Sequence, residues 1–115
     1  MARPSRFLVA LAGLLGAAGV TDAAIAAHVA GGDTLQRAAE ILMTHGAALL
    51  GLAALVARSG ERWTSAAAAG FLGAGAALFG TDVTLLTLQG HRLFPYAAPI
   101  GGSTMISAWL VVGLL

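Results

Sequence analysis

The chain has 115 residues, of which 58% are hydrophobic and only 10% charged. Soluble domains usually carry about 25% charged residues, so a soluble fold would lack the polar surface to cover itself, and the expected solvent is a lipid bilayer. The net charge is +1 with scattered arginines, which excludes a basic nucleic-acid-binding patch, and the absence of cysteine excludes disulfides and thiol catalysis.

Four apolar segments follow one another along the chain, each near the roughly 20 residues that a transmembrane helix needs. We predict spans at about residues 6–29, 35–57, 63–88 and 100–115, forming one four-span domain over residues 1–115. The fourth segment is the shortest, because about 16 residues extend only ~24 Å along a helix. The sequence therefore predicts an all-α integral membrane bundle of four transmembrane helices.

The first segment has a rival interpretation as a secretory signal peptide. The stretch MARPSRFLVALAGLLGAAG has a basic start and an apolar core, and AAIAAH offers small residues for cleavage. The apolar run is longer than a typical signal core of about 7–15 residues. We therefore expect this helix to be retained.

The arginines predict the orientation of the bundle. Four of them flank the membrane on the side of the N-terminus and two lie on the other side: Arg3, Arg6, Arg58 and Arg62 against Arg37 and Arg92. Because cytoplasmic loops carry an excess of basic residues, both termini are predicted to be cytoplasmic.

Small residues are spread over the predicted helices, as in GLLGAAG and GFLGAGAALFG. In lipid, Gly and Ala let helix backbones approach closely. The pattern favours a compact bundle. It also leaves open a contact with another membrane protein or with a second copy through Gly/Ala-rich helix faces.

Three stretches give the chain a family resemblance. They are AAHV at the end of the first segment, THGAALLGLA in the second, and GAALFGTDVTLLTLQGHRLFPYAAPIGGSTMISAWLVVG across the third and fourth. In their order and spacing the chain resembles the small four-helix inner-membrane proteins of the YgdD and YwdK type, the domain-of-unknown-function family numbered 423. The resemblance implies four helices in a bacterial inner membrane, and it implies no reaction.

Two acidic residues depart from the pattern of that family. The resemblance implies a sequence like LFSGSLY where this chain reads LFGTDVT, so Asp82 stands in the place of a small polar residue. Asp22 stands where an apolar residue is usual. A role for either acid therefore has to be argued from this chain alone.

The acids and one histidine are predicted to share a polar layer in the outer half of the bundle. Counted from the span ends, Asp22 and Asp82 lie ~10 Å deep and His45 ~13 Å deep. Three hydroxyls of the fourth span enter from the same side: Ser103, Thr104 and Ser107. Because a lipid-facing carboxylate costs about 2.5–3.5 kcal/mol on insertion scales, we expect Asp82 to face inward, within reach of His45 or Asp22.

Three interpretations of this layer remain open. The first is a set of hydrogen bonds that only fixes helix register, worth roughly 0.6 kcal/mol each. The second is a site for a proton or cation, since ionisable groups inside membranes are functional candidates. The third, a divalent-metal site, has the least support, because no local ligand motif such as HExxH is present. No catalytic residue, cofactor or metal site is predicted.

Taken together, these features predict a small integral inner-membrane protein that is not an enzyme. Its expected role is that of a structural or accessory component of the bilayer. The alternative is a small proton- or cation-coupled transporter that uses the intramembrane Asp/His cluster.

Overall fold

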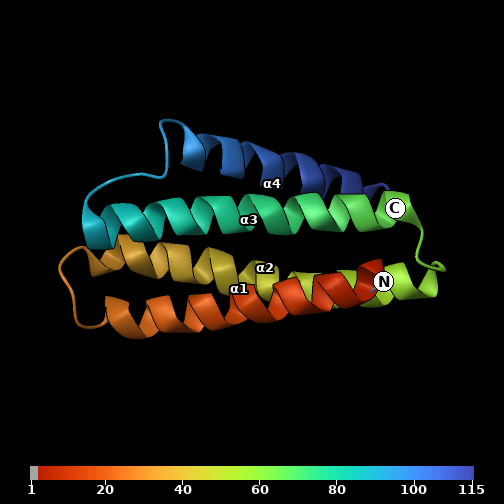
Figure 1. Ribbon diagram of the computed structural model, residues 1–115, viewed down its shortest axis with the longest axis horizontal. Helices are drawn as coiled ribbons and strands as arrows, with labels where there is room; N and C mark the ends of the chain where they lie inside the picture. The colour runs from red at the N-terminus through yellow and green to blue at the C-terminus, as the bar shows by residue number, and fades with distance from the viewer. Residues whose placement is uncertain (1–2) are drawn as a thin grey trace.

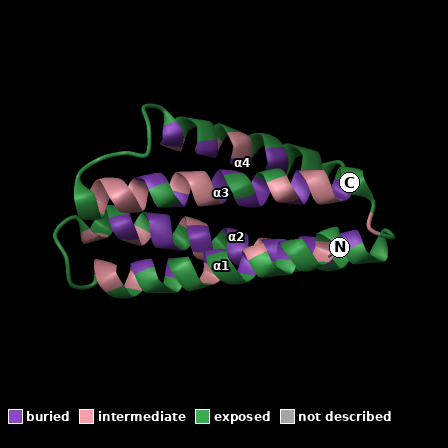
Figure 2. Cartoon of the chain, viewed as in Figure 1, coloured by how far each residue is buried: buried purple, intermediate pink, exposed green. Residues whose placement is uncertain are grey.

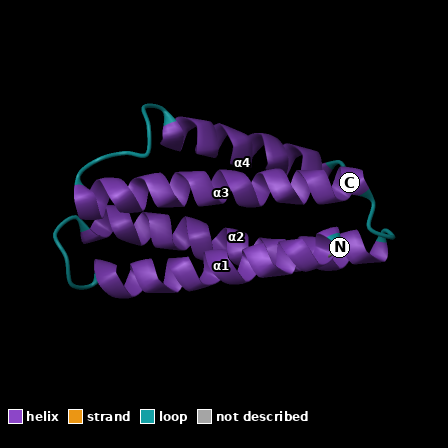
Figure 3. Ribbon diagram, in the orientation of Figure 1, coloured by secondary structure: helices purple, strands orange, loops and turns teal. Residues whose placement is uncertain are grey.

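Residues 3–115, the part of the chain that the computed structural model describes, form four α-helices joined by loops (Figure 3). The helices are α1 (Pro4–Ala26), α2 (Gly32–Arg58), α3 (Trp63–Gln89) and α4 (Ala97–Gly113). The prediction of an all-α fold with four helices is confirmed.

The fourth helix differs from the other three in length. By length and composition α1, α2 and α3 can each cross a membrane, whereas α4 is a shorter apolar helix. The chain is thus a multi-pass membrane protein. Because α3 has 27 residues and α4 has 17, α4 is about 15 Å shorter. It begins at Ala97, earlier than the predicted start at residue 100, and it ends at Gly113.

The helices run up and down along one long axis, and the described chain extends 46 × 26 × 25 Å (Figure 1). Helix α1 packs against α2, α3 packs against both α1 and α2, and α4 packs against α3. The two termini and the α2–α3 loop lie at one end of the bundle, and the other two loops lie at the opposite end. We call these the N-terminal end and the far end.

The core lies where the helices face one another, and the outward faces are exposed (Figure 2). Most of its larger members are leucines from α1, α2 and α3: Leu8, Leu15, Leu42, Leu49, Leu52 and Leu72. Met105 and Ala108 add the contribution of α4. In lipid, burial of apolar groups gives no driving force between helices, so close packing and polar contacts have to hold the bundle together.

Glycines allow two of the closest helix contacts. A Cβ atom on Gly46 of α2 would lie 3.0 Å from the backbone oxygen of Ala12 in α1. Between α3 and α4, a Cβ on Gly75 would lie 2.9 Å from the Gly101 oxygen, and one on Gly101 would lie 2.8 Å from the Gly75 oxygen. Some of the small residues of the predicted helices thus form helix contacts within the bundle.

The turn from α1 to α2 requires two glycines. Gly31 has a φ of +78°, in the left-handed region that glycine adopts without steric cost. A Cβ on Gly32 would clash with the backbone oxygen of Ala26. Residues 27–31 therefore form a tight turn that brings α1 and α2 side by side, and Gly32 and Asp33 of the GGD stretch already belong to α2.

Glu61, in the α2–α3 loop, stabilises the start of α1. Its Oε1 accepts hydrogen bonds from the Ser5 hydroxyl at 2.6 Å and from the Ser5 backbone N–H at 3.1 Å. The first N–H groups of a helix have no partner within the helix, and negative charge is favoured there. The hydrogen bond from the Ser5 hydroxyl lowers the pKa of the Glu61 carboxyl below its ordinary value of 4.5.

Replacing Glu61 with glutamine is expected to lower the thermal midpoint in detergent at neutral pH by a few degrees, because a neutral amide oxygen accepts weaker hydrogen bonds from Ser5 than a carboxylate does. Since the folded-state pKa is lowered, the contribution is present above the ordinary pKa and is lost as the pH falls through the folded-state pKa. Thermal unfolding of both proteins from neutral pH to about pH 4 and below should show the difference shrinking.

The matched control is Asp33→Asn, which removes an exposed acid from the first turn of α2. It removes a charge near a helix start but breaks no contact between elements. An equal loss of stability from both variants would contradict a specific role for the Glu61–Ser5 contact.

Candidate functional site

Asp82 is fully buried and is held by the loop that follows α3, residues 90–96. Its Oδ2 accepts a hydrogen bond from Nη1 of Arg92 at 2.6 Å, and its Oδ1 accepts one from the backbone N–H of Leu93 at 2.9 Å. The Arg92 side chain is 44% exposed. A carboxylate can be buried when it is paired and hydrogen-bonded, so an arginine of the same chain compensates the charge of Asp82.

This contact explains why α4 is short. Asp82 lies seven residues before the end of α3 at Gln89, or about 10 Å along the helix axis. Because the Leu93 N–H bonds to it, the loop turns back beside α3 before α4 begins, as Figure 1 shows. Irregular backbone at membrane depth needs its polar groups satisfied by protein or water. Asp82 satisfies the backbone N–H of Leu93.

Asp22 makes a separate contact between α1 and α3. The residue is 6% exposed, and its carboxylate accepts a hydrogen bond from the Thr84 hydroxyl, Oγ1 to Oδ2, at 2.6 Å. Both residues border a hollow of about 510 Å³ between the two helices, lined otherwise mainly by apolar side chains. The contact ties α1 to α3.

His45 connects α2 to α4. Its Nε2 accepts a hydrogen bond from the indole N–H of Trp109 at 3.1 Å, and its Nδ1 lies 2.7 Å from the backbone oxygen of Ile41. The two rings meet edge to face, with centroids 5.8 Å apart. The indole N–H can only donate, so Nε2 accepts this hydrogen bond. The contacts therefore assign the neutral tautomer in which Nδ1–H donates to the Ile41 oxygen.

The three hydroxyls of α4 lie away from the acids. Thr104 donates to the backbone oxygen of Ile100, one turn earlier, at 2.7 Å. Ser103 and Ser107 are exposed. All three line a hollow of about 510 Å³ between α4 and the first half of α3, beside Trp63 and Phe71.

The predicted partners of Asp82 were therefore wrong. Its partners are Arg92 and the Leu93 amide, and within residues 3–115 no hydrogen bond joins any two of Asp22, His45 and Asp82. The inward position of Asp82 was correct. The reason for the error is angular: Asp82 and Thr84 are two residues apart on α3, so their side chains leave the helix about 200° apart. Similar depth in the membrane does not bring side chains together.

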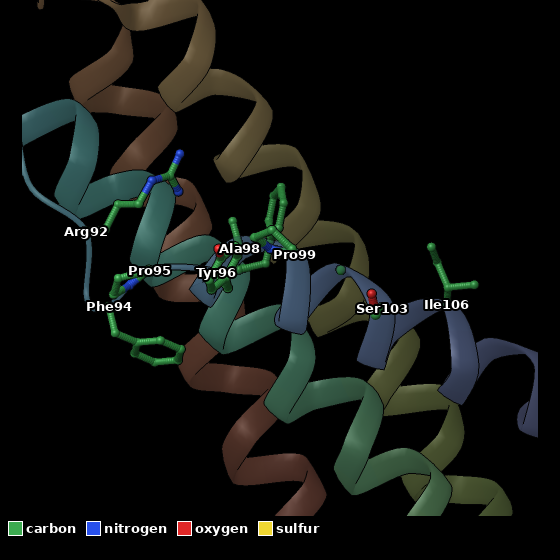
Figure 4. A pocket seen from close by; sticks show the side chains of 10 residues that line it. Arg92, Phe94, Pro95, Tyr96, Ala98, Pro99, Ser103 and Ile106 are labelled. Atoms are coloured by element: carbon green, nitrogen blue, oxygen red, sulfur yellow. The ribbon is translucent and has the colours of Figure 1, made fainter.

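An open groove of about 1020 Å³ lies beside the loop at the far end (Figure 4). Arg92 and Phe94 extend from the loop in different directions, and Ser103 and Ile106 come from α4. The surface combines one charged group with aromatic and aliphatic side chains. In the sequence, Arg92 was used only to predict the orientation of the bundle, and its pairing with Asp82 was not predicted.

The acids and histidines form no metal-binding arrangement in the described chain. Among residues 3–115, no group of three or more His, Asp or Glu side chains is placed to hold a metal ion. Asp22, His45 and Asp82 instead form separate contacts, each joining a different pair of elements.

Comparison with known families gives one match. A family profile described as "Protein of unknown function (DUF423)" matches residues 13–102. The chain belongs to the DUF423 family. The searches of curated proteins and of solved structures gave no match.

The match covers most of the features described for this DUF423 protein. It includes Asp22, His45, Asp82 and Arg92, and it ends in the first turns of α4 at Gly102. Trp109, the partner of His45, lies beyond the matched range. The resemblance found in the sequence is thus confirmed at the level of the family, whose description assigns no activity.

Proposed function

We propose that this DUF423 protein is an integral component of the bacterial inner membrane with a structural or accessory role and no enzyme activity. The observation that carries the proposal is that the three buried ionisable side chains, Asp22, His45 and Asp82, each contact a second element. Asp82 holds the α3–α4 loop, Asp22 binds α3, and His45 binds α4. A proton or cation pathway would instead need polar groups in a continuous series across the membrane.

The proposed topology places both termini in the cytoplasm and α4 as a fourth crossing. Its support is the gathering of four arginines at the N-terminal end, at the start of α1 and around the α2–α3 loop. The far end carries the remaining two. The 17 residues of α4 extend about 26 Å, slightly less than the roughly 30 Å hydrocarbon core.

Purification from native membranes in mild detergent, followed by mass-spectrometric analysis, tests the accessory role. We expect a second membrane polypeptide to copurify in fixed stoichiometry with this chain. We expect the same amount of that polypeptide to copurify when the charge of Asp22 is removed. The Asp22→Asn variant keeps the size of the side chain and serves as the comparison. The absence of any stoichiometric partner would contradict the accessory role.

A proton- or cation-coupled transporter is the second candidate. The observation that favours it is the position of Asp22 at the hollow between α1 and α3. Purified protein in vesicles that contain a pH-sensitive dye distinguishes the two candidates. The accessory role predicts the same proton leak as in empty vesicles, whereas a transporter predicts a leak that Asp22→Asn abolishes.

A further inference from the structure

The outward face of α2 carries exposed residues at alternating steps of four and three. We call this row the α2 seam; its members are Asp33, Arg37, Glu40, Thr44, Ala47, Gly51, Ala54 and Arg58. Such spacing keeps side chains on one side of a helix and is that of the contact positions in coiled coils. The buried residues Leu35, Leu42, Leu49 and Val56 lie on the other side of α2. The other helices of the bundle therefore leave the α2 seam uncovered.

Two charged residues of the α2 seam lie where lipid would surround them. Arg37 and Glu40 are five and eight residues beyond the start of α2 at Gly32, or about 8 and 12 Å along its axis. The 27 residues of α2 extend about 40 Å, so only about 5 Å at each end projects beyond a hydrocarbon core of roughly 30 Å. An upright α2 centred on the bilayer places Glu40 inside the hydrocarbon layer.

Among the described residues, neither charge has an ion-pair partner. Within residues 3–115 the one ion pair is Arg92 with Asp82. Arg37 and Glu40 instead border a hollow of about 490 Å³ on the outside of the bundle, with Thr44 and Phe79. A charged side chain within a membrane is normally paired or faces other protein. Arg37 and Glu40 form no ion pair with each other within residues 3–115, so both can pair with a partner that offers the opposite signs.

We propose that this partner is a second copy of the chain, packed α2 seam against α2 seam around a two-fold axis normal to the membrane. Such an axis keeps equivalent residues at equal depth and makes every contact reciprocal. Arg37 of each copy then lies about 4.5 Å in height from Glu40 of the other, within reach of the long arginine side chain. The Arg37 layer of the dimer therefore lies next to a Glu40 layer of opposite charge.

A lipid headgroup does not pair with both charges of the α2 seam. A phosphate headgroup would pair with Arg37 and would leave Glu40 without a cation. Deeper in the membrane the α2 seam carries Ala47, Gly51 and Ala54, which would let two backbones approach closely. A Cβ atom on Gly51 would meet nothing within 4 Å in its own chain, so packing inside one copy does not require a glycine there.

Oxidative cross-linking tests the dimer, because the chain has no native cysteine. Ala47→Cys, in the α2 seam, should give a product of twice the 11.4 kDa chain mass in native membranes. The matched control is Ala17→Cys, which is also exposed but lies on α1. Equal cross-linking from both positions, or a product of any other mass, would overturn the proposal.

Charge reversal then tests the pairing. In the Ala47→Cys background, Arg37→Glu or Glu40→Arg alone should reduce cross-linking at least severalfold, and the double variant should restore it. Thermal unfolding in detergent identifies any variant that does not fold. Unchanged cross-linking in the folded single variants, or failure of the folded double variant to recover, would contradict the pairing. A monomeric result leaves the proposed accessory role intact.

Discussion

Replacing Asp82 with leucine is expected to destabilise the DUF423 protein by about 1.5–3 kcal/mol, the range for hydrogen bonds to charged groups. Leucine leaves the Leu93 N–H without its acceptor and frees Arg92 from its ion pair. The effect should fall below the roughly 3–5 kcal/mol of a fully buried pair, because the Arg92 side chain is 44% exposed and can turn to water. Reversible unfolding in detergent micelles measures the change.

The loss should be localised to the loop. A cysteine introduced at Phe94, which is exposed, should react faster with a membrane-impermeant maleimide when Asp82 is leucine, because the loop is then no longer held against α3. Asp82→Asn should have an intermediate effect, since its amide oxygen can still accept one hydrogen bond. Unchanged stability and unchanged labelling in Asp82→Leu would show that the carboxylate does not anchor the loop.

The second large effect is expected at the crossing of α3 and α4. In Gly101→Ala, the new Cβ would lie 2.8 Å from both the Gly75 oxygen and the Phe79 nitrogen, which are backbone atoms that cannot rotate away. The helices must therefore separate, with an expected loss of about 1–3 kcal/mol, as for other overpacked sites. Thermal or denaturant unfolding of the whole bundle in detergent measures this loss of stability.

Gly102→Ala is the matched control for this substitution. Gly102 is the next residue of α4, and a Cβ there would meet nothing within 4 Å. Both variants gain the higher helix propensity of alanine, so the difference between them reports the contact alone. Similar stabilities for Gly101→Ala and Gly102→Ala would contradict the close α3–α4 crossing.

Hydropathy was sufficient to predict the helices but not all of their limits. Long apolar runs separated by polar turns specify α1, α2 and α3, because only helices satisfy their backbone groups inside lipid. The start of α4 was placed three residues late, at residue 100 instead of Ala97. Pro99 lies in the first turn of α4, where a missing N–H is tolerated, so the proline did not mark the boundary.

The partners of the buried polar residues could not be read from depth alone. Depth gives height along the bundle axis, whereas contact also requires side chains on facing sides of the helices. Asp22 and Asp82 illustrate the difference, because Asp22 bonds to Thr84 while Asp82 bonds to the loop. One signal for the loop contact was present: a fourth apolar segment much shorter than the third requires the connection to run back along the bundle.

A double-mutant cycle between Asp82 and Arg92 tests the central claim that Asp82 anchors the α3–α4 loop. The unfolding free energies of Asp82→Asn, Arg92→Gln and the combined variant give the coupling, and a parallel cycle with His45→Gln serves as the reference. The structure predicts a coupling of about 1 kcal/mol or more with Arg92, and additivity within about 0.5 kcal/mol with His45. Additivity with Arg92 together with strong coupling to His45 would contradict the claim.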